Sequence, residues 1–281
     1  MGRSRRNELG IVWDELGPVE DILAAGAPPE TLRTSDQTVE ASAIRSGRDA
    51  VILAVKDQPH YNRYVDETEI SGLTLQLPRD SQNCPALQLA WPHPENLKIE
   101  QAGGVPTVKL RPFALSVVLL WSCDQTRLQK AQEMMTAKLP DVARYALNVL
   151  ADEQTKTAAV SRHLPHDLQG DPALLDEAAK LLEKARGAVH ANDWATAWQQ
   201  ARSGLASTEE YRAEAMRAAA TDADRRGEGD RARYFLNLYF SLPNYAYVTR
   251  GGAAIEPGQL RKEILEAEAV PVWPSIDRVA H

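Results

Sequence analysis

The sequence predicts an α+β protein, in which an N-terminal antiparallel β-sandwich is followed by an antiparallel α-helical bundle with one tetratricopeptide-like hairpin. Two observations support this prediction. Apolar residues alternate with polar ones in short stretches up to Cys123, which is typical of half-buried strands. From Asp124 onward they recur every three to four residues, which is typical of amphipathic helices. The predicted segments are a lead-in at 1–32, the sandwich at 33–123, the bundle at 124–250 and a tail at 251–281.

The lead-in segment is expected to be a short helix over residues 10–27, interrupted at Gly17-Pro18. The sequence "PPE" at 28–30 then ends the helical pattern, because proline lacks a backbone donor and restricts its neighbours.

The sandwich is predicted to hold roughly seven short strands. "VEASAIR" (39–45) and "AVILAVK" (50–56) flank residues 46–49, "SGRD", which favour a hairpin turn. "ALQLAW" places Trp91 on the same face as Leu87 and Leu89, and "ALSVVLLW" ends at Trp121, so both indoles are expected in the core. Many short strands separated by Pro and Gly clusters favour a sandwich.

Cys84 and Cys123 are the two cysteines of the chain. Their positions do not fix how close they lie, so the sequence leaves open whether they form a disulfide.

The helical half is expected to contain roughly five helices with short polar connections. Asp124, Asp171 before Pro172, and Asp193 are predicted N-caps, and Ser207–Glu210 matches a capping box. Pro140 is expected to separate the first two helices.

Trp194 and Trp198 lie on one predicted helix face, together with Ala201 and Leu205. We interpret this face as packing against the preceding helix at 172–189. The alternative is a binding groove, which would make the hairpin at 172–206 a protein-interaction module.

The segment 234–248 concentrates aromatic residues, and its tyrosines are candidate contacts for a carbohydrate or a protein partner because their rings combine apolar area with a polar edge. The alternative is a helix that covers the core. The tyrosines concerned are Tyr234, Tyr239, Tyr245 and Tyr247.

His163 and His166 form the only close histidine pair, with Asp167 adjacent. They are the candidate metal ligands, but no HExxH pattern is present and a solvated loop is the preferred interpretation. The acidic pair Asp14-Glu15 is expected to be an ordinary surface pair. The sequence contains no GxSxG, Walker A or CxxC motif, so we predict no catalytic residue, no metal and no cofactor, with an enzyme of unrecognised site as an alternative.

Composition describes an ordinary globular chain of 281 residues, with 43% hydrophobic and 25% charged residues. The net charge of −7 argues against a nucleic-acid partner. No apolar run approaches the roughly 18–20 residues of a membrane span, and the basic start lacks a signal-peptide core. The chain as given is therefore expected in the cytoplasm, or outside it as a piece of a longer exported precursor.

The stretches "VEASAIRSGRDAVILAVKD" and "VKLRPFALSVVLLWSCD" resemble the C-terminal β-sandwich of glycoside-hydrolase-like proteins. "LLDEAAKLLEKARGAVHANDWATAWQQARSGLASTEEYRAEAM" and the following "YFSLPNY" are similar to a helical module after such sandwiches in large exported bacterial proteins. The resemblance covers roughly residues 10–250. It implies a non-catalytic accessory region, associated with carbohydrate-active proteins and with a polysaccharide or protein as partner, because the catalytic barrel is not part of this sequence.

Overall fold

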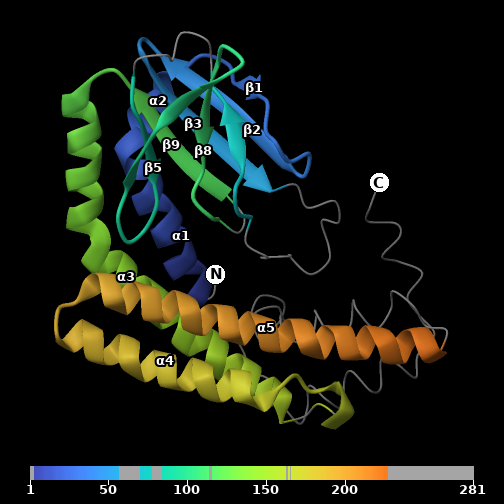
Figure 1. Ribbon diagram of the computed structural model, residues 1–281. Helices are drawn as coiled ribbons and strands as arrows, with labels where there is room; N and C mark the ends of the chain where they lie inside the picture. Colours follow the sequence, from blue (N-terminus) through green and yellow to red (C-terminus); the bar gives the residue numbers. More distant parts are fainter. Residues whose placement is uncertain are drawn as a thin grey trace. The chain divides into compact units, whose positions relative to one another are not determined.

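The computed structural model describes residues 3–56, 70–77, 84–113, 116–162, 164 and 166–226. It confirms the α+β class, with antiparallel sheets and a helical region (Figure 1). The strands are β1 (Glu30–Leu32), β2 (Val39–Ser46), β3 (Asp49–Lys56), β4 (Thr74–Gln76), β5 (Ala86–Leu89), β6 (Glu95–Leu97), β7 (Ile99–Ala102), β8 (Val105–Lys109) and β9 (Ser116–Ser122). The helices are α1 (Arg3–Leu16), η1 (Gly17–Val19), α2 (Glu20–Ala25), α3 (Gln125–Ser161), η3 (His166–Leu168), α4 (Pro172–His190) and α5 (Trp194–Arg226).

The strands form two sheets. The large sheet has the order β1-β2-β3-β9-β5-β6, and the small sheet has the order β4-β8-β7. The predicted hairpin joins β2 to β3, with Val39 opposite Lys56 and Ser46 opposite Asp49. Gly47 has a φ of +62° in the connecting turn, a backbone conformation that glycine adopts without steric cost.

The large sheet is buried on both faces, which differs from the expectation of one buried face per strand. Odd-numbered positions of β9, such as Leu119, contribute to the core shared by the two sheets. Even-numbered positions, such as Leu120, join a second core with Ile22 of α2 and Met135 of α3. The almost continuous apolar sequence of β9 follows from this position between two layers.

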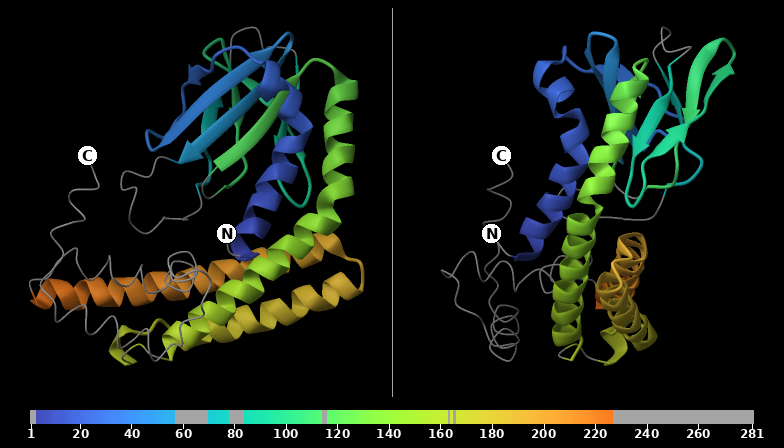
Figure 2. Two further views of the ribbon diagram at one scale, coloured as in Figure 1. Left: turned by 180° about the vertical axis from the view of Figure 1, so that it is seen from behind. Right: turned by 90° about the vertical axis from the view of Figure 1, so that its left-hand side faces the viewer.

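Helices α1, α2 and the first part of α3 cover the outer face of the large sheet (Figure 2). A Cβ atom at Gly10 of α1 would lie 2.9 Å from Cε2 of Tyr145, so glycine permits the close approach of α1 to α3. Lys138 of α3 also pairs with Asp14 of α1 at 3.2 Å. The interruption at Gly17-Pro18 is confirmed as a short 3₁₀ helix, and the lead-in helix begins earlier than predicted, at Arg3.

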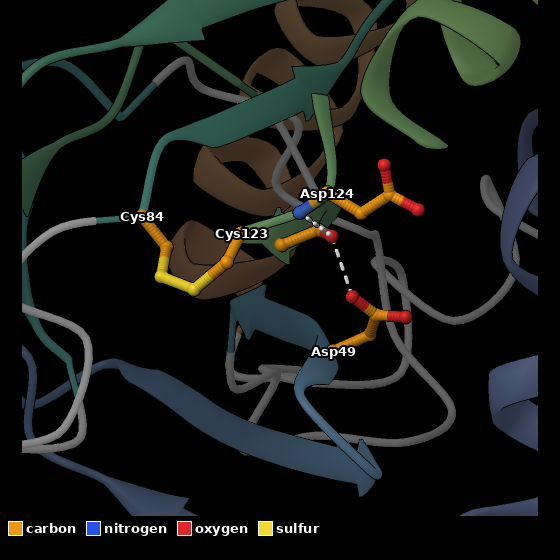
Figure 3. The surroundings of a disulfide bond; sticks show 5 residues. Asp49, Cys84, Cys123 and Asp124 are labelled. Atoms are coloured by element: carbon orange, nitrogen blue, oxygen red, sulfur yellow. Dashed lines mark hydrogen bonds between the residues drawn. A yellow bond between two sulfur atoms is a disulfide. The ribbon is translucent and has the colours of Figure 1, made fainter. Parts of the chain in front are cut away.

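A disulfide joins Cys84 to Cys123, with Cα atoms 4.4 Å apart, and so settles the pairing that the sequence left open (Figure 3). Beside it, Ser122 Oγ donates to Asp49 Oδ1 at 2.5 Å and accepts from the backbone N–H of Asp124 at 3.0 Å. The disulfide therefore links the residues just before β5 to the connection between β9 and α3.

Arg127 of α3 ties this junction to the lead-in segment. Its Nη2 donates to both carboxylate oxygens of Asp21, at 2.6 and 2.7 Å, and its Nη1 lies 3.3 Å from Asp49 Oδ2. The hydrogen bond from Arg127 lowers the pKa of Asp21. Because one nitrogen of Arg127 contacts both carboxylate oxygens of Asp21, this ion pair joins α2 to the start of α3.

The caps at Asp124, Asp171 and Asp193 are confirmed, since each carboxylate accepts a backbone N–H of the first turn that follows it. The expected number of five helices is wrong for the described residues, which contain α3, α4 and α5 as the long helices. Pro140 lies inside α3, because burial of Leu139 and Val142 on either side stabilises the continuous helix.

The capping box at Ser207–Glu210 does not begin a helix either. It lies in the interior of α5, where the buried hydroxyl of Thr208 donates to the carbonyl of Gly204 at 2.9 Å. Such a bond to the preceding turn satisfies the hydroxyl without ending the helix.

The chain divides into two compact units, and their boundaries cross the long helices. One contains Ser4–Leu150 and Lys180–Ser203, and so includes both sheets. The other includes Ala151–Ala179 and the described residues from Gly204 onward. The domain boundaries at 33, 124 and 250 stay predictions.

The second unit is held by a charged network. Arg212 donates to Thr157 Oγ1 at 2.8 Å, to Glu153 Oε2 at 2.6 Å and to Glu209 Oε1 at 2.8 Å. Lys156 donates to the other oxygen of Glu153 at 2.6 Å. Burial raises the pKa of Glu153, whereas the positive charges of Arg212 and Lys156 lower it. The net shift of this pKa is downward. None of the described helices is long and apolar enough to cross a membrane.

Candidate tryptophan and arginine site

Two indole rings and a guanidinium pack together within the first unit, a carboxyl group interacts electrostatically with that guanidinium, and we name this group the Trp198 cluster. Its members are Glu15 of α1, Trp91 after β5, and Trp198 and Arg202 of α5. The ring centroids of Trp91 and Trp198 are 6.4 Å apart with planes tilted by 58°. The Cζ atom of Arg202 lies 5.9 Å from the centroid of the Trp198 ring, within the range of a cation–π contact.

Local sequence explains how α5 supplies two of these residues. Asn192 has a φ of +57° after α4, and the backbone N–H of Asp193 donates to the carbonyl of Ala188 at 2.9 Å. Asp193 then caps α5 by accepting the backbone N–H of Thr196 at 3.1 Å. Residues four apart on the helix share a face, which places Arg202 one turn after Trp198.

The members of the cluster differ in exposure. Trp198 is 8% exposed and Arg202 is exposed. Trp91 is half-buried and packs partly against the core that the large sheet shares with the helices. Its indole Nε1 is buried, and no described residue accepts a hydrogen bond from it. The cluster therefore combines indole surface, a buried donor and an accessible guanidinium.

Glu15 has the most perturbed carboxyl group of the described residues. Burial raises its pKa from 4.5 to about 7, while the positive charge of Arg202 acts in the opposite direction. The expectation that Asp14-Glu15 is an ordinary surface pair is therefore wrong for Glu15, because burial of its side chain disfavours the charged form.

Arg202 has no close partner of opposite charge among the described residues. Neither a hydrogen bond nor an ion pair within 4 Å joins it to any of them. Its contacts are the cation–π contact with Trp198 and the electrostatic interaction with Glu15. A guanidinium carries five N–H donors in one plane, so donors remain available to a ligand.

A second pair lies one turn earlier on α5. The Cζ atom of Arg144, from α3, is 4.7 Å from the centroid of the half-buried Trp194 ring. Arg144 also pairs with Asp141 at 3.2 Å. Trp194 thus packs beneath a cation from α3, and Trp198 packs on an indole from the sandwich. Trp198 is buried and its ring partner is Trp91, whereas packing of the Trp194 and Trp198 face against the helix at 172–189 stays a prediction.

Within the described part of the chain, none of the other predicted site residues lies in the Trp198 cluster. Tyr234, Tyr239, Tyr245 and Tyr247 lie outside the described residues, as does His163. His166 lies in η3 and is exposed. In the part of the chain that the structure describes, no group of three or more His, Cys, Asp or Glu side chains could hold a metal ion.

Sequence reasoning missed Glu15 and Arg202. The spacing of Trp198 and Arg202 is a local signal for a cation–π contact along one helix face. No comparable signal exists for Glu15, since its burial is set by the tertiary structure and not by its neighbours in the sequence.

No family model and no curated protein matches the chain. Among solved structures, the chain is similar to alpha-L-fucosidase isoenzyme 2 from Paenibacillus thiaminolyticus, with 10% sequence identity and a TM-score of 0.27. The match covers 34% of this chain and 16% of that chain. The chain thus spans a small part of the enzyme's length, and a likeness of this size carries no argument about fold or activity.

Proposed function

We propose that this chain is a non-catalytic accessory region of a carbohydrate-active protein and that it contacts a glycan through the Trp198 cluster. The observation that supports this proposal most directly is the packing of two indole rings and a guanidinium, together with a carboxyl group that interacts electrostatically with the guanidinium.

The chemistry of a sugar ring fits these groups. A pyranose has an apolar C–H face and a rim of hydroxyl groups. The half-buried indole of Trp91 offers apolar area to the first, and Arg202 and Glu15 offer donors and acceptors to the second. Binding sites for small ligands commonly combine aromatic side chains with a few polar groups in this way.

Two further observations support the setting. The disulfide between Cys84 and Cys123 is typical of proteins in oxidising compartments, which agrees with an exported protein. The sequence resemblance to accessory segments of glycoside-hydrolase-like proteins also supports a role beside a catalytic domain. The hairpin at 172–206 is less suited to peptide binding, because its Trp198 already packs on Trp91.

The proposal is tested by affinity electrophoresis of the full chain through gels that contain neutral or acidic polysaccharides, near pH 6. We expect retardation by at least one polysaccharide and a loss of retardation in Arg202→Gln. Arg186→Gln is the matched control, because Arg186 is an exposed arginine of α4 that pairs with Glu183 and not with a member of the cluster.

Circular dichroism must show that Arg202→Gln is folded. If folded wild-type protein migrates unchanged in every gel, glycan contact is refuted. Release of reducing sugar from the retarding polysaccharide by the purified chain would refute the non-catalytic part of the proposal.

A further inference from the structure

We propose that Cys123 is the sulfur at which external thiols and disulfides break and form the bond to Cys84, and that the folded chain holds the two thiols side by side when they are reduced. The pair is then a reversible redox couple, which stabilises the fold without being needed for its formation. This inference is independent of the proposed glycan contact.

The first argument is the pairing of the strands beside the cysteines. β5 and β9 are antiparallel neighbours, and the backbone N–H of Ser122 donates to the carbonyl of Pro85 at 3.3 Å. The next position of this ladder sets Cys84 directly opposite Cys123. Since hydrogen-bonded and non-hydrogen-bonded pairs alternate, the cysteines form a non-hydrogen-bonded pair, in which Cα atoms ordinarily lie about 4.5 Å apart. The observed distance of 4.4 Å shows that backbone pairing alone brings the thiols within reach of each other.

The second argument is that contacts without sulfur hold the same junction. The hydroxyl of Ser122 donates to Asp49 and accepts from the backbone N–H of Asp124 (Figure 3). Arg127 joins this point to Asp21 and lies 3.3 Å from Asp49 Oδ2. None of these contacts requires the disulfide, so we expect the junction between β9 and α3 to persist when the bond is reduced.

The third argument is the difference in exposure between the two cysteines. Cys123 lies in the connection between β9 and α3 and is exposed. Cys84 is 6% exposed and belongs to the core that the two sheets share. Thiol–disulfide exchange requires an incoming sulfur to reach the sulfur that it attacks. An external reagent therefore reaches Cys123, whereas Cys84 reacts from within the protein.

The chemistry balances with an external disulfide as the oxidant. The Cys123 thiolate attacks one sulfur of that disulfide, which forms a mixed disulfide and releases one external thiolate. The Cys84 thiolate then attacks Cys123 Sγ, which forms the internal bond and releases the second external thiolate. Two electrons pass from the cysteine pair to the oxidant, and the two cysteine protons end on the two released thiols. Reduction by an external thiol follows the same steps in reverse.

The first test is pulse alkylation of the reduced full chain with iodoacetamide, followed by mass spectrometry of its peptides. In native buffer, Cys123 should react at least about tenfold faster than Cys84, because a buried thiol reacts only when the chain opens locally. In concentrated urea the two rates should become similar, which controls for the intrinsic reactivity of each cysteine. Circular dichroism of the reduced chain should match that of the oxidised chain.

The second test follows the reaction with oxidised glutathione. The reduced wild type should recover its internal disulfide without retaining glutathione. Cys84→Ser should stop at a stable mixed disulfide between glutathione and Cys123, because no second thiol displaces it. Cys123→Ser is the matched variant, and its Cys84 should take up glutathione at least about tenfold more slowly in native buffer.

These outcomes separate the two parts of the proposal. Equal alkylation of both cysteines in the folded wild type would refute entry at Cys123, and this measurement requires no variant to fold. Loss of native circular dichroism on reduction would refute the claim that the fold holds the thiols in place. Accumulation of glutathione on the reduced wild type would refute rapid closure by Cys84.

Discussion

Replacing Glu15 by Gln should make the protein more stable at alkaline pH and leave its stability nearly unchanged in acid. Burial raises the pKa of Glu15 from 4.5 to about 7 in the folded state. At pH values between these two pKa values, the Glu15 carboxyl group keeps its proton in the folded chain and has lost it in the unfolded chain. The unfolded state therefore binds fewer protons, and the free energy of unfolding falls as pH rises from 4.5 to 7.

The size of this effect follows from the two pKa values. The difference is 7 − 4.5 = 2.5, and each pKa unit corresponds to about 1.4 kcal/mol, so the upper limit is about 3 kcal/mol. Gln has nearly the shape of Glu but carries no charge, so Glu15→Gln avoids this fall in the free energy of unfolding. Water that enters the partly exposed site would reduce the gain.

The assay is urea unfolding of wild type and Glu15→Gln at several pH values from about 4.5 to 8. The difference in unfolding free energy should grow with pH and level off above the folded pKa. Glu40→Gln, at an exposed position of β2, controls for the loss of one negative charge. A difference for Glu15→Gln that stays constant across this range would show that burial does not keep the carboxyl group neutral.

Three further stability predictions rest on other contacts. Cys84→Ser should lower the free energy of unfolding by about 4 kcal/mol in non-reducing urea titrations, since the disulfide closes a loop of 39 residues; an unchanged midpoint would contradict this. Arg212→Ala should cost about 1.5–3 kcal/mol by the same assay, because it leaves the half-buried carboxylate of Glu153 with Lys156 as its remaining cation, and a cost below about 0.5 kcal/mol would show that the network is dispensable. Gly187→Ala, where a Cβ meets nothing within 4 Å, should raise the thermal midpoint through a gain of about 0.5–1 kcal/mol. In Gly10→Ala, about 1–3 kcal/mol of overpacking should offset the same gain. Its thermal midpoint should therefore be lower than that of Gly187→Ala.

Local signals in the sequence predicted the elements that local physics decides. The strands around Gly47 were predictable because their alternation and turn residues act within a few positions. Asp124 and Asp193 were predictable as caps, since each carboxylate accepts an N–H from a residue two or three positions along. The change from strand to helix between Ser122 and Gln125 was visible for the same reason.

Other features depend on distant packing and could not be derived locally. Pro140 normally disfavours a helix interior, but α3 continues because its buried face packs on both sides of the proline. Thr208 lies in a cap-like sequence, yet its burial within α5 makes the bond to Gly204 the better solution. Glu15 has a shifted pKa because tertiary structure buries it, and periodicity cannot give that information.

The position of β9 constrains how the protein is made on the ribosome. This strand lies between β3 and β5 in the large sheet, although it is the last strand of the sheet to be synthesised. A nascent chain that ends before Ser116 has two separate ribbons, β1-β2-β3 and β5-β6, each with an open hydrogen-bonding edge. Open edges of this kind invite pairing with other chains, so the interval before β9 emerges is when the protein depends most on protection from aggregation.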